Sequence, residues 1–260
     1  MPLAGKDGRH ALAPGRFDRR QDAYLVVHQD VVPRRIAALH VVQLLFLVDV
    51  DQHTAADLRR HLTQAFGAER QERYWVLFEQ LRKELGYADY LGALQRYRVE
   101  NPRDPHLLAV SSYLVDYPFA DRLFPGALDV IKHLGGWGPV VILSDGDVVF
   151  QPRKVERSGI AEAVGGHVLI YIHKEEELDD VERRYPARHY VLVDDKPRIL
   201  AAVKAVWGER VTTVLPRQGQ YARDAAVVAS LPAADLTVER VGDLLTYDFP
   251  ALTMVDTKGT

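Results

Sequence analysis

Four groups of polar residues, each at or shortly beyond the end of an apolar run, place the strongest constraint on the fold of this chain. The runs consist mainly of β-branched and aliphatic residues without polar alternation, which is typical of strands buried on both faces of a parallel sheet. Ligands of such a sheet bind outside the carboxyl ends of its strands. We therefore expect one site at this edge. Its polar groups, in chain order, are Asp49 with Asp51, Ser144 with Asp145, Lys174, and Asp194 with Asp195.

The second half of the chain alternates between strand patterns and helix patterns. Strands are predicted at 139–143, 167–172, 190–193 and 211–215, and helices at 126–134, 150–158, 175–184 and 197–207. Such alternation with short connections is typical of a parallel sheet with right-handed crossovers. The predicted fold class is α/β, with a Rossmann-like parallel sheet core that is flanked by helices.

Between the first strand and residue 118 the apolar residues recur at helical spacing, and Gly67 and Gly86 interrupt the pattern as stop signals. This predicts a helical-bundle cap at 55–118, inserted into an α/β core made of 41–54 and 119–260. The many aromatic residues of the cap favour bundle packing over stacking on a substrate. Residues 1–40 are basic, and Pro14 and Pro33 break any long element there, so this stretch is predicted to form a partly disordered N-terminal extension.

Composition excludes several kinds of site. The chain of 260 residues has no cysteine, which excludes disulfides, thiolate nucleophiles and cysteine-ligated metal centres. Its formal net charge of −3 gives no reason to expect nucleic acid or an anionic membrane as a partner. The first twenty residues lack the apolar segment of a secretory signal, and the run from Val41 to Val48 is too short to span a bilayer. We expect a cytoplasmic protein.

The two acidic pairs suit a hard cation. Side chains two residues apart on a strand point to the same side, so Asp49 and Asp51 can face one pocket. Carboxylate oxygens are ligands that Mg²⁺ prefers, and two carboxylates can also divide the work of nucleophile and proton carrier. On its own, Asp-x-Asp is more often a polar turn, and Asp194-Asp195 before Pro197 also fits a helix cap. The second pair nevertheless gives the first a partner for sharing a cation.

The hydroxyl and the ammonium group suit an anion. Ser144, Asp145 and Gly146 stand where a strand turns toward a helix, a place where backbone N–H groups cradle anions; the same residue types also form ordinary turns. Lys174 can neutralise phosphate charge, although an exposed lysine is the commoner case. What favours a site is the order Asp-x-Asp, Ser, Lys and Asp-Asp, each at or near a strand end.

This order resembles that of the haloacid dehalogenase-like (HAD) hydrolase superfamily, in the subgroup whose helical cap follows the first motif. The similarity covers about residues 44–245, and the region from Ser144 to Asp195 carries its most specific part. The resemblance implies that Asp49 attacks phosphorus and that Asp51 protonates the leaving oxygen and then activates water. It also implies a phosphate-binding group that comprises Ser144, Asp145 and Lys174. The implied magnesium site comprises Asp49, Asp51 through its backbone carbonyl, Asp194 and Asp195.

The resemblance implies a Mg²⁺-dependent phosphohydrolase that acts on a small phosphorylated metabolite through an aspartyl-phosphate. The chain departs from the family pattern after Asp51, where His53 replaces the customary Thr and the segment leading to Asp57 is shortened. That segment normally forms a flap beside the nucleophile. An alternative is therefore a catalytically weakened protein of this fold with a binding or regulatory role. A receiver-like signalling domain also uses Asp, Ser or Thr, and Lys at strand ends, but the helical insertion and the late acidic pair disfavour it.

Overall fold

The computed structural model describes residues 41–44 and 55–249, and its centre is a parallel β-sheet. Within the described residues the sheet has six strands in the order β3-β2-β1-β4-β5-β6, and every neighbouring pair is parallel. The strands are β1 (Val41–Leu44), β2 (Val140–Asp145), β3 (Val168–Tyr171), β4 (Tyr190–Val193), β5 (Val211–Pro216) and β6 (Leu236–Val238). The α/β fold class predicted from the sequence is confirmed.

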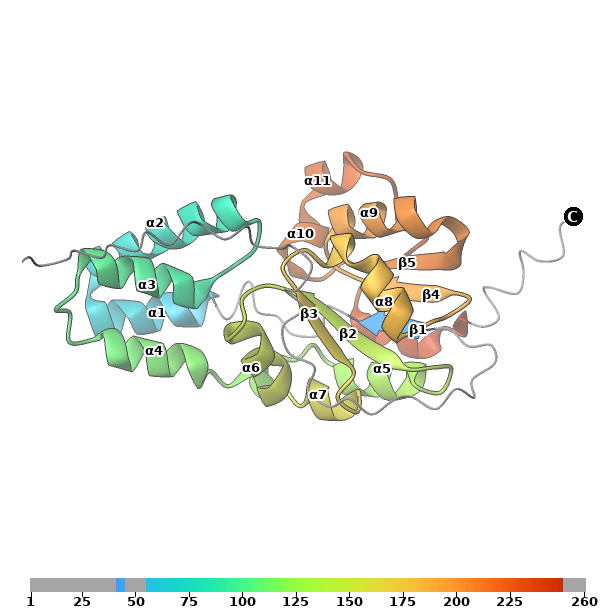
Figure 1. Ribbon diagram of the computed structural model, residues 1–260, viewed down its shortest axis with the longest axis horizontal. Helices are drawn as coiled ribbons and strands as arrows, with labels where there is room; N and C mark the ends of the chain where they lie inside the picture. The colour runs from blue at the N-terminus through green and yellow to red at the C-terminus, as the bar shows by residue number, and fades with distance from the viewer. Residues whose placement is uncertain (1–40, 45–54, 250–260) are drawn as a thin grey trace, which may run out of the picture.

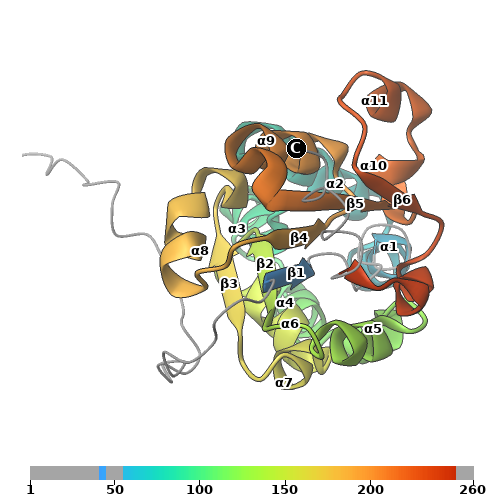
Figure 2. The same ribbon diagram turned by 90° about the vertical axis from the view of Figure 1, so that its right-hand side faces the viewer.

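Helices cover both faces of this sheet, as the end-on view in Figure 2 shows. Alternate residues of β2 and β4 point to opposite sides, which explains why their sequences are apolar throughout. Val140 and Ile142 belong to the apolar cluster that includes α5 and α6, whereas Val141 and Leu143 belong to the cluster that includes α8 and α9. These helices are α5 (Ala127–Leu134), α6 (Phe150–Arg157), α8 (Leu178–Arg184) and α9 (Pro197–Trp207).

The predicted strands and helices of this region lie within a few residues of the observed ones. Shorter elements were not predicted: α7 (Ile160–Ala163), α10 (Gly219–Arg223), α11 (Ala225–Ala229) and the strand β6. Each has three to five residues, too few to show a period in the sequence. The apolar run 45–48 that precedes Asp49 lies outside the described residues, as do residues 1–40.

Four helices lie together at one end of the sheet (Figure 1). They are α1 (Ala55–Phe66), α2 (Ala68–Leu85), α3 (Tyr90–Glu100) and α4 (Leu107–Val115). Helix α1 packs against α2 and α4, and α3 also contacts both, so the four helices form a bundle. Most of its predicted apolar stripe is buried, including Tyr74, Phe78 and Tyr97. Gly86 ends α2 in the left-handed conformation with a φ of 80°, where a residue without Cβ is favoured.

Polar and aromatic contacts fasten this bundle to the sheet region. Asp57, near the start of α1, accepts a hydrogen bond from the Tyr117 hydroxyl at 2.8 Å and pairs with Arg122, so the chain is joined where it enters and leaves the bundle. The ring of Tyr90 lies 4.7 Å from that of Phe150 on α6.

Among the residues that the structure describes, no helix combines the length and the apolar character needed to cross a bilayer.

Candidate functional site

The sheet order brings the predicted strand ends to one edge. Strand β1 lies between β2 and β4, and its last residue, Leu44, pairs with Val193 at the end of β4. Strand β2 ends at Asp145, and Asp194 directly follows β4. The chain runs from β1 to β2 and β3 on one side of β1, and then continues with β4 on its other side. Open α/β sheets bind their ligands at the point where the strand order reverses in this way.

Lys174 lies at the centre of the described site. It follows β3 at the start of a single 3₁₀ turn (Lys174–Glu176), and its side chain is fully buried. The Nζ atom lies 2.7 Å from Oδ2 of Asp194 and 3.9 Å from Oδ1 of Asp145. Three residues predicted from separate strand ends thus come together around one ammonium group. An ammonium group buried among carboxylates is held by charge, because desolvating it alone would be prohibitive.

Lys196, which sequence reasoning did not select, completes this charge cluster. Its Nζ donates to both carboxylate oxygens of Asp145, at 3.2 and 3.3 Å. Burial raises the pKa of the Asp145 carboxyl, but the positive charges of Lys174 and Lys196 outweigh burial and hold that pKa well below its ordinary value. For Lys196, burial by itself would lower the pKa of the ammonium group, but the negative charge of Asp145 outweighs burial and raises that pKa above its ordinary value. The sequence signal was present only as a lysine directly after the second acidic pair.

The second acidic pair is deeply enclosed. Asp194 has no exposed surface and Asp195 is 1% exposed. Oδ1 of Asp194 accepts the backbone N–H of Lys196 at 3.0 Å, and Pro197 opens α9, so this carboxylate also orders the helix start. The capping interpretation and the site interpretation therefore apply to the same residue.

The turn after β2 is built for close approach. Ser144 is buried, and its hydroxyl lies 3.4 Å from Oε1 of Gln151 on α6. Gly146 has a φ of 146°, a backbone conformation that residues with a side chain rarely adopt, and a Cβ there would lie 2.5 Å from the Gln151 side chain, so glycine is favoured. Asp147 accepts the backbone N–H groups of Val149 and Phe150 at 2.9 and 2.6 Å, which fixes the start of α6. Burial raises the pKa of the Asp147 carboxyl.

The donor chemistry at this edge fits Mg²⁺. Asp194 and Asp195 offer buried carboxylate oxygens, the ligand type that a small hard cation prefers. In the part of the chain that the structure describes, no group of three or more His, Asp or Glu residues is arranged to hold a metal. Asp49 and Asp51, the other predicted ligands, lie outside the described residues. The complete magnesium site and the phosphate-binding group both remain predictions.

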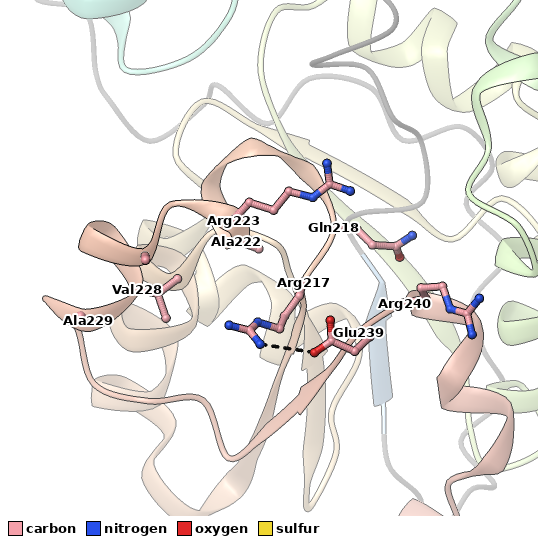
Figure 3. Close-up of a pocket in the computed structure, with 9 residues that line it drawn as sticks. Arg217, Gln218, Ala222, Arg223, Val228, Ala229, Glu239 and Arg240 are labelled. Atoms are coloured by element: carbon pink, nitrogen blue, oxygen red, sulfur yellow. Dashed lines mark hydrogen bonds and ion pairs between the residues drawn. The ribbon is translucent and has the colours of Figure 1, made fainter.

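A separate cavity of about 750 Å³ lies at the ends of β5 and β6 beside α10 and α11 (Figure 3). None of the predicted site residues lines it. Arg217 pairs with Glu239 across it at 3.3 Å, while the Arg223 and Arg240 side chains extend in other directions. Guanidinium groups that diverge do not make an anion site, so we assign this cavity no function.

The lowered pKa of Asp145 predicts that acid reduces the stability of the folded protein. The unfolded chain has an ordinary Asp145 pKa of 3.8, and the folded protein has a lower one. As pH falls through this window, the unfolded state takes up a proton that the folded state does not, so the free energy of unfolding decreases. Removing a neighbouring charge in Lys196→Met should weaken this dependence. Urea unfolding measured from about pH 5 to about pH 2 should show a smaller decrease in the free energy of unfolding for the variant than for the unaltered protein. If the free energy of unfolding falls equally steeply with pH in both proteins, the pairing of Lys196 with Asp145 is not the origin of the acid sensitivity.

Comparison with known proteins identifies the family. No family model and no curated protein matches the chain. Among solved structures, a haloacid dehalogenase-like hydrolase from Burkholderia xenovorans LB400 shares 61% identity with a TM-score of 0.78, and the match covers 82% of this chain and 100% of that one.

Two distant structures share the fold. A haloacid dehalogenase-like family hydrolase from Xanthomonas campestris has 16% identity and a TM-score of 0.57 over 88% of this chain and 96% of that one. The HAD-hydrolase YfnB from Bacillus subtilis, solved bound to magnesium, has 12% identity and a TM-score of 0.55 over 80% and 97%. The identity and coverage of the Burkholderia match show that this chain belongs to the haloacid dehalogenase-like hydrolase family.

Proposed function

We propose that the protein is a magnesium-dependent phosphatase of a small phosphorylated metabolite and that it works through an aspartyl-phosphate at Asp49. The observation that carries the proposal is the meeting of Lys174, Asp145 and Asp194 at the carboxyl edge of the sheet. A site that handles a phosphate dianion needs positive charge fixed in place before the substrate arrives. The buried Lys174 ammonium, held by two carboxylates, is preorganised in this way.

The proposed reaction has two steps. In the first, a carboxylate oxygen of Asp49 forms a bond to phosphorus while the bond to the leaving alcohol oxygen breaks, and Asp51 gives that oxygen its proton. In the second, water attacks the aspartyl-phosphate, Asp51 takes the water proton, and phosphate leaves with the original carboxylate restored. Bound magnesium would supply charge neutralisation for the anionic nucleophile and substrate. Asp49, Asp194 and Asp195 would hold it, with the Asp51 carbonyl. The magnesium reported for the Bacillus structure supports this cofactor by analogy.

The phosphoryl group itself is assigned to Ser144 and Lys174, with Asp145 beside them. The structure places the Asp145 carboxylate between two ammonium groups, so its part in phosphate binding is to hold these cations in position. The bundle α1–α4, within the proposed cap at 55–118, would cover the site and exclude water during the reaction.

Metal removal tests this function directly. With magnesium, the purified protein should hydrolyse p-nitrophenyl phosphate, and excess chelator should lower the rate at least about tenfold, because charge neutralisation by the metal is lost. Adding magnesium back should restore the rate. If magnesium and phosphate bind but no ester is hydrolysed, the alternative of a catalytically weakened binding or regulatory protein, suggested by the altered segment 52–57, is favoured instead.

A further inference from the structure

The carboxylate of Asp147 uses only one of its two oxygens within the described protein. Its Oδ1 atom accepts the backbone N–H groups of Val149 and Phe150 and so fixes the start of α6. Its Oδ2 atom is buried and has no hydrogen-bond partner among the described residues, and the residue as a whole is 8% exposed. A buried carboxylate oxygen without a partner is unfavourable, and folded proteins provide such an atom with a ligand or a water molecule.

The α2–α3 loop of the bundle lies against the same part of the sheet region. Figure 1 shows this loop, residues 86–89, at the end of the bundle that faces the sheet. A Cβ on Gly86 would lie 3.2 Å from the imidazole of His173, which follows β3. At the other end of the loop, Tyr90 packs on Phe150, with 4.7 Å between the ring centres. The loop therefore runs between the segments that follow β3 and β2, beside the proposed phosphate site.

This loop brings a second carboxylate and a hydroxyl group near Asp147. Asp89 precedes α3, where its Oδ1 atom accepts the backbone N–H of Gly92 at 2.6 Å. Burial raises the pKa of the Asp147 carboxyl, the two N–H groups of α6 lower it, and the negative charge of Asp89 raises it further. Burial also raises the pKa of the Tyr87 hydroxyl, and the charges of Asp89 and Asp147 add to that change. The start of α6 therefore offsets the charge of Asp147 only in part.

The described residues provide no paired cation for these two carboxylates. No ion pair joins a described lysine, arginine or histidine to Asp147 or Asp89. Asp89 acts on Arg96 of α3, but that guanidinium already donates to both oxygens of Glu84, at 3.0 and 2.6 Å. The carboxylates with the largest effects on the pKa of Lys196 belong to its own charge cluster and do not include Asp147. A ligand with one positive charge would suit this place.

We propose that Oδ2 of Asp147, with Asp89 and Tyr87 beside it, binds an ammonium group on the alcohol part of the phosphate ester. The substrate class is then a phosphate monoester of a short amino alcohol, and this inference rests on the proposed phosphatase function. An alkylammonium group carries one positive charge and three N–H donors, which match two carboxylates and a hydroxyl oxygen. It is also about the size of a water molecule, so it can meet a buried oxygen.

The separation from the phosphate site fits a short alcohol. Asp147 follows Ser144 by three residues, so their Cα atoms are at most about 10 Å apart. An alcohol of two or three carbons, together with the two side chains, can span this separation. The ammonium group lies on the part of the substrate that does not react, so its recognition should act mainly on binding.

Matched probes test this selection by calorimetry. O-phosphoethanolamine and propyl phosphate have the same chain length, and an ammonium group in the first takes the place of a methyl group in the second. In an Asp49→Asn background with magnesium, where the ester is not consumed, phosphoethanolamine should bind at least about tenfold more tightly, the usual range for a charge-assisted hydrogen bond. A third probe, 2-hydroxyethyl phosphate, has a donor without a charge and should bind less tightly than phosphoethanolamine.

Two variants, each added to the Asp49→Asn background, assign this preference to the carboxylates. Asp147→Asn removes the charge but keeps an Oδ1 acceptor for the start of α6, and it should bring the affinity ratio of phosphoethanolamine to propyl phosphate to within about twofold. Asp89→Asn keeps the acceptor for Gly92, acts from the bundle, and should lower the ratio about threefold. Asp129→Asn, which changes an exposed carboxylate on α5, is the control and should leave the ratio unchanged.

The outcomes separate this proposal from the function on which it rests. Equal binding of phosphoethanolamine and propyl phosphate, or a preference that persists in Asp147→Asn, overturns the ammonium site even if the unaltered enzyme hydrolyses both esters. Equal binding of the hydroxyl and ammonium probes overturns it as well. Urea unfolding checks that Asp147→Asn is folded, and if it is not, an undiminished preference in Asp89→Asn overturns the site. If no ester is hydrolysed but the preference is present and depends on Asp147, the phosphatase function fails and the ammonium site stands.

Discussion

Replacement of Asp49 by asparagine is expected to lower kcat/KM for p-nitrophenyl phosphate at least about 1000-fold, because an amide oxygen is a poor nucleophile and cannot form the aspartyl-phosphate. The assay is steady-state hydrolysis with saturating magnesium. Mass spectrometry of acid-quenched protein should detect a phosphoryl adduct on the peptide that contains Asp49 in the unaltered enzyme and none in the variant.

Asp121→Asn is the matched control for this change. Asp121 is an exposed carboxylate in the 3₁₀ turn Phe119–Arg122 and is not among the candidate site residues, so its loss should leave kcat/KM within about twofold. If Asp49→Asn kept more than a tenth of the rate, covalent catalysis at Asp49 would be excluded. The remaining activity would then have to come from direct attack by water.

Replacement of Lys174 by methionine is expected to lower the free energy of unfolding by about 3–5 kcal/mol, because it removes the cation that pairs with the buried Asp194 carboxylate. Asp194 is fully buried and bonds the Lys174 ammonium at 2.7 Å, so its charge would remain in a low-dielectric site with no neighbouring solvent. The measurement is equilibrium unfolding in urea at neutral pH without divalent metal, where the transition midpoint should fall while its slope stays the same.

Two comparisons identify the cause of this loss. Lys132→Met on the surface of α5 should change stability by less than about 0.5 kcal/mol. The double variant Lys174→Met with Asp194→Asn should be more stable than Lys174→Met alone, because the unpaired charge is removed with its partner. A double variant at least as unstable as the single one would show that packing of the lysine stem, and not charge pairing, accounts for the effect.

Much of the fold could be predicted because burial imposes a period on the sequence. The stripes that contain Leu58, Tyr74 and Tyr90 predicted α1, α2 and α3, and continuous apolar runs predicted β2 and β4. The elements that escaped prediction, such as α7 and β6, are too short to complete a period. The ends of the elements could be predicted where glycine or proline interrupts the backbone pattern, as at Gly86 and Pro197.

The residues of the candidate site could be predicted from the sequence only in part. Lys174, Asp145 and Asp194 could be selected because each follows a strand, and parallel strands present these ends at one edge. Lys196 could not, because its role depends on a side chain that crosses from the start of α9 to the end of β2. The Arg82–Tyr221 contact joins residues 139 positions apart, and no local pattern indicates it.

The sequence by itself determined the α/β class, the helical insertion and the strand ends that carry the candidate site residues, because hydrophobic periodicity and chain order are properties of the sequence alone. Tertiary structure alone decided which charges neutralise one another. The pairing between Lys196 and Asp145, and the contact between Arg82 and Tyr221, follow from how the bundle and the helices pack on the sheet. Electrostatic energy depends on distances and on burial, and both exist only once the chain has folded.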